Sequence, residues 1–132
     1  MNRKWVKMSQ DSYRASQMLH ANAIYRSAVS RAYYCGYAAL VAILSDVKGV
    51  RFGHGGNNPS HETLASLVKN LDDRIYGKMR KKWMLQAIRR LRAARVLSDY
   101  GPNAVIEYEE ATRCIKDAAF MVTTLGILGA TS

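Results

Sequence analysis

A stripe of small and apolar residues runs through the segment from Ile24 to Val47. Its members recur every three or four positions and are Ala28, Ala32, Cys35, Ala39 and Ile43. This spacing places all of them on one face of an α-helix, and their small size allows a neighbouring helix to approach closely. We therefore expect this segment to be a helix against which other helices pack.

Helical patterns account for the rest of the chain as well, and no stretch sustains the apolar–polar alternation of a strand. Four further helices are predicted: Arg3 to His20, His61 to about Leu71, the basic segment that follows Gly77, and the segment after Pro102 that ends near Leu125. Ser60 provides an N-cap for the third helix. Because most connections are short, the predicted fold class is all-α, an up-and-down bundle of about five helices.

The last predicted helix has an apolar face of its own. The residues at helical spacing are Val105, Tyr108, Thr112, Ile115, Ala119, Val122 and Leu125. We expect these side chains to point towards the core of the bundle.

The length of 132 residues suits a single domain spanning 1–132, with a tail after about residue 126 that is expected to fray. No apolar stretch is long enough to span a bilayer, and no signal-peptide pattern occurs. Cys35 and Cys114 lie inside apolar helical patterns, so both are expected to be reduced core residues. These features predict a cytoplasmic protein with no metal, no cofactor and no membrane partner.

A glycine- and asparagine-rich loop is expected from Lys48 to Ser60. His54 and His61 flank it, but its glycines follow neither the G-x-G-x-x-G pattern nor a Walker motif, so a phosphate-cradling loop is only weakly indicated. We expect His61, near a helix start, to have a structural role.

The charge of the chain is strongly and locally positive. Lys and Arg number 20 against 10 acidic residues, which gives a net charge of +10, and the stretch from Arg74 to Arg95 holds basic residues and no acid. Such a block favours binding of a polyanion such as RNA or of a strongly acidic protein. The ordinary alternative is a basic surface that contacts only solvent. The basic residues expected to face RNA are Lys78, Arg80, Lys81, Lys82, Arg89 and Arg90.

One arginine occupies a position where a helix should be apolar. Met84, Ile88 and Leu91 follow the rhythm of one buried face, and the next position in the series is Arg95. Burying a guanidinium without a partner costs several kcal/mol. Arg95 is therefore expected to face a cleft, a subunit boundary or a carboxylate.

A turn of Ser98 to Pro102 follows Arg95 and adds a carboxylate and a phenol. The candidate ligand-binding residues are Arg31, Arg92, Arg95, Asp99 and Tyr100, and of these Arg95 and Tyr100 are the candidate catalytic residues. Two alternatives stay open for this site. Arg95 either pairs internally with Asp99 or faces a ligand, and Tyr100 either packs its ring at the helix end or contacts phosphate.

Two short motifs resemble the HEPN domain (higher eukaryotes and prokaryotes nucleotide-binding). The run from Tyr25 to Tyr34, which ends in Arg31-Ala32-Tyr33-Tyr34, resembles the second-helix signature of that family, which typically shows an Arg-Ala-Tyr-Tyr run. Residues 91–100 resemble the R-x-x-R-x-x-A-D-Y end of its penultimate long helix. His61 lies where many bacterial members have a histidine opening the middle helix. The resemblance covers nearly the whole chain, from about Trp5 to Leu125.

The resemblance implies a compact helical bundle that is usually a homodimer. In the ribonuclease branch of the family, an arginine is followed by four to six residues and a histidine, and two copies of this motif face each other across the dimer. Many small members pair with a minimal nucleotidyltransferase as toxin and antitoxin, and in some pairs a tyrosine close to the motif is adenylylated.

This chain departs from the ribonuclease motif, because Tyr100, Gly101 and Pro102 occupy the positions where the histidine would follow Arg95. An imidazole titrates near neutral pH and a phenol does not, so Tyr100 is a poor replacement in proton transfer.

The expected function is binding of RNA or nucleotide through a basic groove, as the toxin-like or accessory member of a pair with a nucleotidyltransferase. The alternatives are an active metal-independent endoribonuclease, which would use Tyr100 or a histidine from a partner subunit, and a non-catalytic protein-interaction adaptor. Tyr33 and Tyr34 are expected to be core and interface aromatics more than platforms for base stacking.

Overall fold

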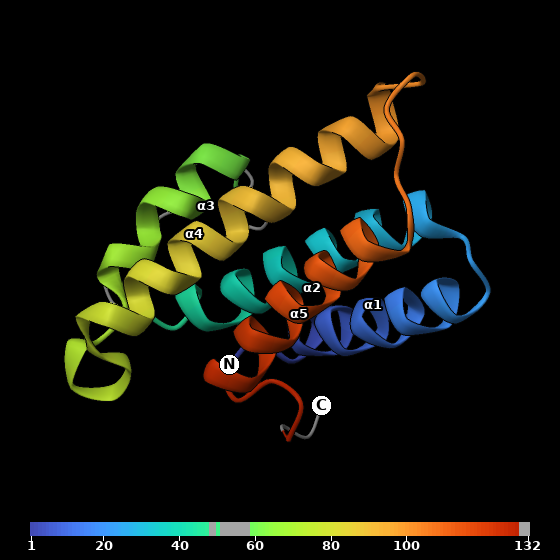
Figure 1. Cartoon of the computed structure of the whole chain (residues 1–132). Coiled ribbons are helices and arrows are strands. Elements are labelled where there is room, and N and C mark those ends of the chain that lie inside the picture. Colours follow the sequence, from blue (N-terminus) through green and yellow to red (C-terminus); the bar gives the residue numbers. More distant parts are fainter. Residues whose placement is uncertain (48–49, 51–58, 130–132) are drawn as a thin grey trace.

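The computed structural model of the chain describes residues 1–47, 50 and 59–129 (Figure 1). The helices are α1 (Arg3–Ala21), α2 (Tyr25–Leu44), α3 (His61–Leu67), the 3₁₀ helix η1 (Val68–Asn70), α4 (Asp73–Tyr100) and α5 (Tyr108–Thr124). The described residues include no strand. The predicted all-α class with five helices is confirmed.

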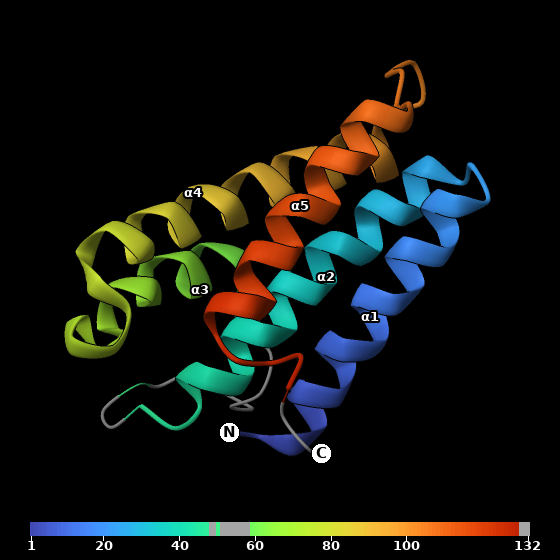
Figure 2. The same ribbon diagram turned by 60° about the horizontal axis from the view of Figure 1, so that its bottom comes forward.

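Helix α2 lies at the centre of the bundle, packed against α1 on one side and α4 and α5 on the others (Figure 2). The predicted small-residue stripe is confirmed, because Ala28, Ala32, Cys35 and Ala39 are fully buried. By length and composition α2 could also cross a membrane, but most of it is buried within the bundle, as in the core helix of a globular fold.

Gly36 is the point at which α2 comes closest to its neighbours. A Cβ atom placed there would lie 2.9 Å from Sδ of Met121 and 3.2 Å from Cδ1 of Leu91. Glycine is therefore needed at this position so that α4 and α5 can both pack on α2.

The buried face of α5 agrees with the predicted one only in part. Val122 and Leu125 are buried as predicted, whereas Val105 and Tyr108 are 71 % and 57 % exposed, and the other buried residues are Ala111, Cys114, Ala118 and Met121. Small side chains on this face let α5 approach α2, and the helix begins at Tyr108, with its N-cap Glu107 and Glu110 forming a capping box. Val105 therefore precedes the helix altogether.

The predicted helix boundaries are close to those observed, with two refinements. The third helix was expected to reach Leu71 but ends at Leu67 and continues as η1. Ser60 caps α3 as predicted, since its hydroxyl accepts from the backbone N–H of Thr63. In α4 the backbone breaks at Gly77, with φ 76° and ψ 156°, so the long basic helix follows Gly77 and a short helical turn precedes it.

Ile127 belongs to the core although it lies beyond α5. It is fully buried, its N–H donates to the carbonyl of Val122, and its carbonyl accepts from the side chain of Gln10 at 2.8 Å. Fraying of the tail after about residue 126 stays a prediction. Residues 130–132 lie outside the described part of the chain.

Candidate functional site: an arginine cluster between α2, α3 and α4

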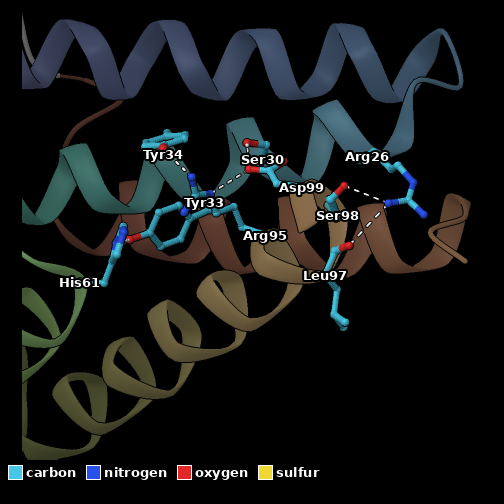
Figure 3. A network of polar contacts seen from close by, with 9 residues as sticks. All are labelled: Arg26, Ser30, Tyr33, Tyr34, His61, Arg95, Leu97, Ser98 and Asp99. Carbon is cyan, nitrogen blue, oxygen red and sulfur yellow. Dashed lines mark hydrogen bonds and ion pairs between the residues drawn. The ribbon is translucent and has the colours of Figure 1, made fainter. Parts of the chain in front are cut away.

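Three helices bring polar and aromatic side chains together on one side of the bundle (Figure 3). We define the arginine cluster as Tyr33 and Tyr34 of α2, His61 of α3, and Arg92 and Arg95 of α4. The two tyrosines belong to the run Arg31 to Tyr34, and the two arginines belong to the helix-end motif. The two motifs that carry the family resemblance therefore meet in space.

Arg95 is neither buried without a partner nor directed into bulk solvent. Its side chain is 15 % exposed, Nε donates to Oδ2 of Asp99 at 2.9 Å, and Nη2 donates to the hydroxyl of Tyr34 at 3.0 Å. The predicted internal ion pair with Asp99 is present. Nη1 makes no hydrogen bond to any described residue, so its N–H groups remain available to an anion.

Three aromatic rings surround the guanidinium of Arg95. Its central carbon lies 5.3 Å from the ring centroid of Tyr34, 5.8 Å from that of Tyr33 and 5.7 Å from that of Tyr100. These distances are within the range of cation–π attraction. The ring of Tyr100 thus lies beside Arg95 while the residue is 69 % exposed, so both interpretations of Tyr100 stay open.

His61 lies beside the two arginines. Its Nδ1 forms a hydrogen bond with the hydroxyl of Tyr33, and Nε2 has no hydrogen-bond partner among the described residues. Burial, followed by the positive charges of Arg92 and Arg95, lowers the pKa of His61. Burial also raises the pKa of Tyr33, which keeps its phenol protonated. At neutral pH the cluster therefore holds a neutral imidazole next to two guanidinium groups.

His61 lines two hollows in the surface. The smaller one has a volume of about 130 Å³ and lies between α2, α3 and α4, with two exposed arginines and one carboxylate in its lining. It is lined by Tyr33, His61, Glu62, Ala65, Ser66, Ile88, Arg89 and Arg92. The larger one, which we name the aromatic hollow, has a volume of about 550 Å³ and lies between α1, α2 and the start of α3. It is lined by Trp5, Met8, Ser12, Arg31, Tyr34, Tyr37, Ala38, Pro59 and His61.

Arg92 and Arg31 are the more accessible cations beside this cluster. The side chain of Arg92 is 44 % exposed, and its contact with Glu62 is long, at 3.8 Å. Arg31 is exposed and forms no ion pair with a described residue. It lines both the aromatic hollow and a further hollow of about 390 Å³ that contains Asp99. Arg31 thus lies near Asp99, although the hydroxyl that reaches this carboxylate is that of Ser30, at 3.5 Å.

The basic residues of α4 divide into two groups. Lys81 is engaged, since Nζ donates to Asp73 and to the carbonyl of Lys69, and Arg90 makes a two-pronged ion pair with Asp117 that raises the pKa of Arg90. The exposed residues without an ion pair in the described part of the chain are Lys78, Arg80, Lys82 and Arg89. That any of the six basic residues named from the sequence contacts RNA stays a prediction. Lys81 and Arg90 are the least suited to such a contact, because both are already paired with a carboxylate.

Sequence reasoning missed the role of Arg26. Its guanidinium donates to carbonyl oxygens at the end of α4 and in the following turn, including those of Ser98 at 2.9 Å and Gly101 at 3.0 Å, and that of Ala104. Ser98 lies in the last turn of α4, where carbonyls lack partners within the helix, and a cation suits the negative end of the helix dipole. Arg26 thereby fixes the end of α4, which carries Asp99 and Tyr100; the turn expected to begin at Ser98 starts only after Tyr100, because the helix continues to that residue. The only signal of this role in the sequence was that Arg26 belongs to the motif run, ahead of Arg31.

Other candidates contribute little to the site. Cys35 and Cys114 are buried free thiols, and burial raises their pKa to about 12 and about 11, so neither is a reactive thiolate. Within the described ranges no group of three or more His, Cys, Asp or Glu residues could hold a metal ion. His54 lies outside the described residues.

Comparison with curated proteins and with solved structures gives no match. The HEPN domain model, by contrast, matches residues 2–128, which is nearly the entire chain. This span includes every helix described above and both halves of the arginine cluster. The chain therefore belongs to the HEPN domain family, a family related to nucleotide and RNA binding and to ribonuclease-like activity.

Proposed function

We propose that this HEPN-domain protein binds single-stranded RNA through the arginine cluster and the neighbouring Arg31, with Arg92 and Arg31 as the accessible cations and Arg95 as the fixed one. The observation that carries the proposal is the position of Arg95. Its guanidinium is oriented by Asp99 and Tyr34, while Nη1 has no hydrogen-bond partner among the residues that the structure describes. A guanidinium held in one orientation can donate to a phosphate without a large loss of side-chain entropy.

The surrounding charge supports the same proposal. Arg89 and Arg92 line the smaller hollow beside His61, and Arg31 lines the aromatic hollow on the other side. The distribution of cations on both sides of Arg95 suits an extended chain of phosphates better than one isolated anion. The exposed residues Lys78, Arg80 and Lys82 extend the positive surface along α4.

A second candidate function is metal-independent cleavage of RNA, and the observation that favours it is His61. In place of a histidine after Arg95, His61 of the same chain brings a neutral imidazole to the cluster, with Nε2 unpartnered among the described residues. An imidazole near a phosphate-binding arginine can accept the proton of a ribose 2′-hydroxyl, which then displaces the 5′-oxygen and leaves a 2′,3′-cyclic phosphate. Incubation of labelled RNA with the protein and a chelator tests this. Cleavage that is lost in His61→Gln and retained in Lys116→Gln supports it, and no cleavage rejects it.

The biological setting we propose is that of the toxin-like or accessory member of a pair with a minimal nucleotidyltransferase, acting as a homodimer in the cytoplasm. Exposed apolar side chains at the end of α4 support a subunit contact there, since Val96, Leu97 and Tyr100 are 42 %, 54 % and 69 % exposed. The exposure of Tyr100 also leaves its hydroxyl accessible to a modifying enzyme. Light scattering of the purified protein distinguishes a dimer from a monomer.

Arg92→Gln provides the test of RNA binding that disturbs the fold least. The side chain is largely exposed and its contact with Glu62 is long, so the variant should fold normally. We expect its affinity for a fluorescently labelled oligoadenylate to fall about tenfold, since charged hydrogen bonds contribute about 1.5–3 kcal/mol. Fluorescence anisotropy measures this change.

The matched control is Lys116→Gln, which removes one exposed positive charge from α5. Its affinity should change much less than that of Arg92→Gln. Equal losses in the two variants would contradict a specific site at the arginine cluster. Failure of the unmodified protein to bind RNA, together with capture of an acidic protein partner, would favour the adaptor interpretation instead.

A further inference from the structure

The aromatic hollow has the dimensions and lining of a ligand site. Its volume of about 550 Å³ lies within the range of roughly 300–1,000 Å³ that is common for small-molecule sites. Three of its lining side chains are Trp5 of α1 and Tyr34 and Tyr37 of α2. Their ring centroids lie 5.9 Å apart for Trp5 and Tyr37, and 6.4 Å apart for Tyr34 and Tyr37.

The rings are not fully used in packing. Trp5 and Tyr34 are only half-buried, so part of each ring is open to the hollow, and the indole N–H of Trp5 has no hydrogen-bond partner among the described residues. The hydroxyl of Tyr37, by contrast, donates to the carbonyl of Pro59 at 2.6 Å. A flat ring with apolar faces and a polar edge fits these surroundings, because its faces can stack while its edge accepts from the indole.

Positive charge lies directly at the rim of the hollow. Arg31 is part of the lining, and Tyr34 links the hollow to Arg95 because its hydroxyl accepts from Nη2 at 3.0 Å. A ligand that places a flat ring against Trp5 and Tyr34 would therefore have cations within reach on the side of α2. Aromatic rings beside backbone-binding cations are the arrangement by which proteins hold unpaired nucleotides.

We propose that the aromatic hollow binds one unpaired nucleobase of a single-stranded RNA, whose neighbouring phosphates contact Arg31 and the arginine cluster. The proposal rests on the RNA binding proposed above and adds a second kind of contact to it. Stacking on Trp5 and Tyr34 supplies affinity for the base, and the arginines supply affinity for the backbone. The two contributions can be separated experimentally.

The experiment compares two labelled RNA oligomers of about ten nucleotides, a length within the usual range of single-strand sites. One is an oligoadenylate, and the other has the same ribose-phosphate backbone without bases. The variant is Trp5→Ala, and Trp83→Ala is its matched control because Trp83 is also partly exposed but packs on Phe120, away from the hollow. Circular dichroism verifies that both variants are folded.

We expect Trp5→Ala to weaken binding of oligoadenylate about tenfold, which is typical of the loss of one stacked base, and to leave binding of the base-free oligomer unchanged. Trp83→Ala should alter neither. If Trp5→Ala does not fold, the Trp83→Phe variant is used instead. Trp5 is then the only tryptophan in the sequence, so the tryptophan fluorescence reports on the aromatic hollow alone. This fluorescence should be quenched by oligoadenylate and not by the base-free oligomer.

Two results would overturn the inference and leave RNA binding intact. The first is equal binding of both oligomers by the unmodified protein with Trp5 unquenched. The second is a Trp5→Ala variant that keeps its affinity for oligoadenylate but no longer forms dimers, which would assign the hollow to a second copy of the chain. Failure of both oligomers to bind would overturn RNA binding as well.

Discussion

Arg95 and Asp99 form an ion pair between successive turns of α4, with Nε of Arg95 2.9 Å from Oδ2 of Asp99. The pair explains how a permanent cation can continue the series of buried residues Met84, Ile88 and Leu91. Asp99 balances part of the charge and fixes the plane of the guanidinium, while Tyr34 holds Nη2. The negative charge of Asp99 therefore weakens the attraction of the arginine cluster for an approaching anion. This effect can be measured.

Removal of the negative charge of Asp99 should strengthen RNA binding. In Asp99→Asn the amide oxygen can still accept from Arg95, but its charge no longer opposes a phosphate. We expect the affinity for oligoadenylate to rise about two- to fivefold, the effect of one partly exposed charge pair. Asp117→Asn is the control, because it removes the same charge from the ion pair of Arg90. An equal or larger gain in Asp117→Asn would contradict the special position of Asp99.

Arg26 should stabilise the fold although much of its guanidinium is near the surface. In Arg26→Ala the carbonyls of Ser98 and Gly101 lose a charged donor. Unfolding in urea should show a free energy of unfolding lower by about 1.5–3 kcal/mol. Arg14→Ala, on the exposed face of α1, should change it by less than about 0.5 kcal/mol. Equal stabilities of the two variants would show that the contacts of Arg26 contribute nothing.

Gly36 should tolerate no larger residue. In Gly36→Val the added side chain would displace Met121 and Leu91 from their contacts with α2, because even a Cβ atom lies within 3.2 Å of both. We expect a loss of about 1–3 kcal/mol in the free energy of unfolding. Ser27→Val, at an exposed position of the same helix, controls for the lower helix propensity of valine. Unchanged thermal stability of Gly36→Val would show that the helices can separate at little cost.

The lowered pKa of His61 predicts a dependence of stability on pH. The unfolded chain takes up a proton on this imidazole below its ordinary pKa of about 6.5, whereas the folded chain takes it up only at lower pH. The contribution of neutral His61 to the free energy of unfolding is therefore complete above a pH of about 6.5. It is lost as the pH falls through the pKa that His61 has in the folded chain. Urea unfolding at a series of pH values between about 7.5 and 5 should show a steeper loss in the unmodified protein than in His61→Gln. Identical profiles would contradict the contact of His61 with the arginine cluster.

The sequence predicted those features that depend on one helix alone. The stripe from Ala28 to Ala39 identified the central helix, and the interruption of an apolar series singled out Arg95, which lies in the arginine cluster. Asp99 lies one turn beyond Arg95, so their ion pair also follows from helical spacing. Each of these inferences needs only the period of the α-helix.

Features that depend on contacts between helices were not predictable in this way. Arg26 is distant in sequence from the carbonyls it contacts, and His61 approaches Arg92 and Arg95 only because α3 packs beside α4. The predicted face of α5 was right at Val122 and wrong at its start, where Tyr108 is exposed and the small residue Ala111 packs instead. The aromatic hollow likewise joins Trp5 to residues of another helix.

The dependence of RNA affinity on salt tests the central claim most directly, because it counts the phosphates that the protein neutralises. For a single strand, the slope of log affinity against log salt concentration is about −0.7 per phosphate contact. The double variant Arg31→Gln/Arg92→Gln should show a slope shallower by about 1.4 than the unmodified protein, whereas Arg14→Gln/Lys116→Gln, with the same loss of charge, should keep the original slope. A slope unchanged in the first variant, or reduced equally in both, would contradict phosphate binding at the arginine cluster.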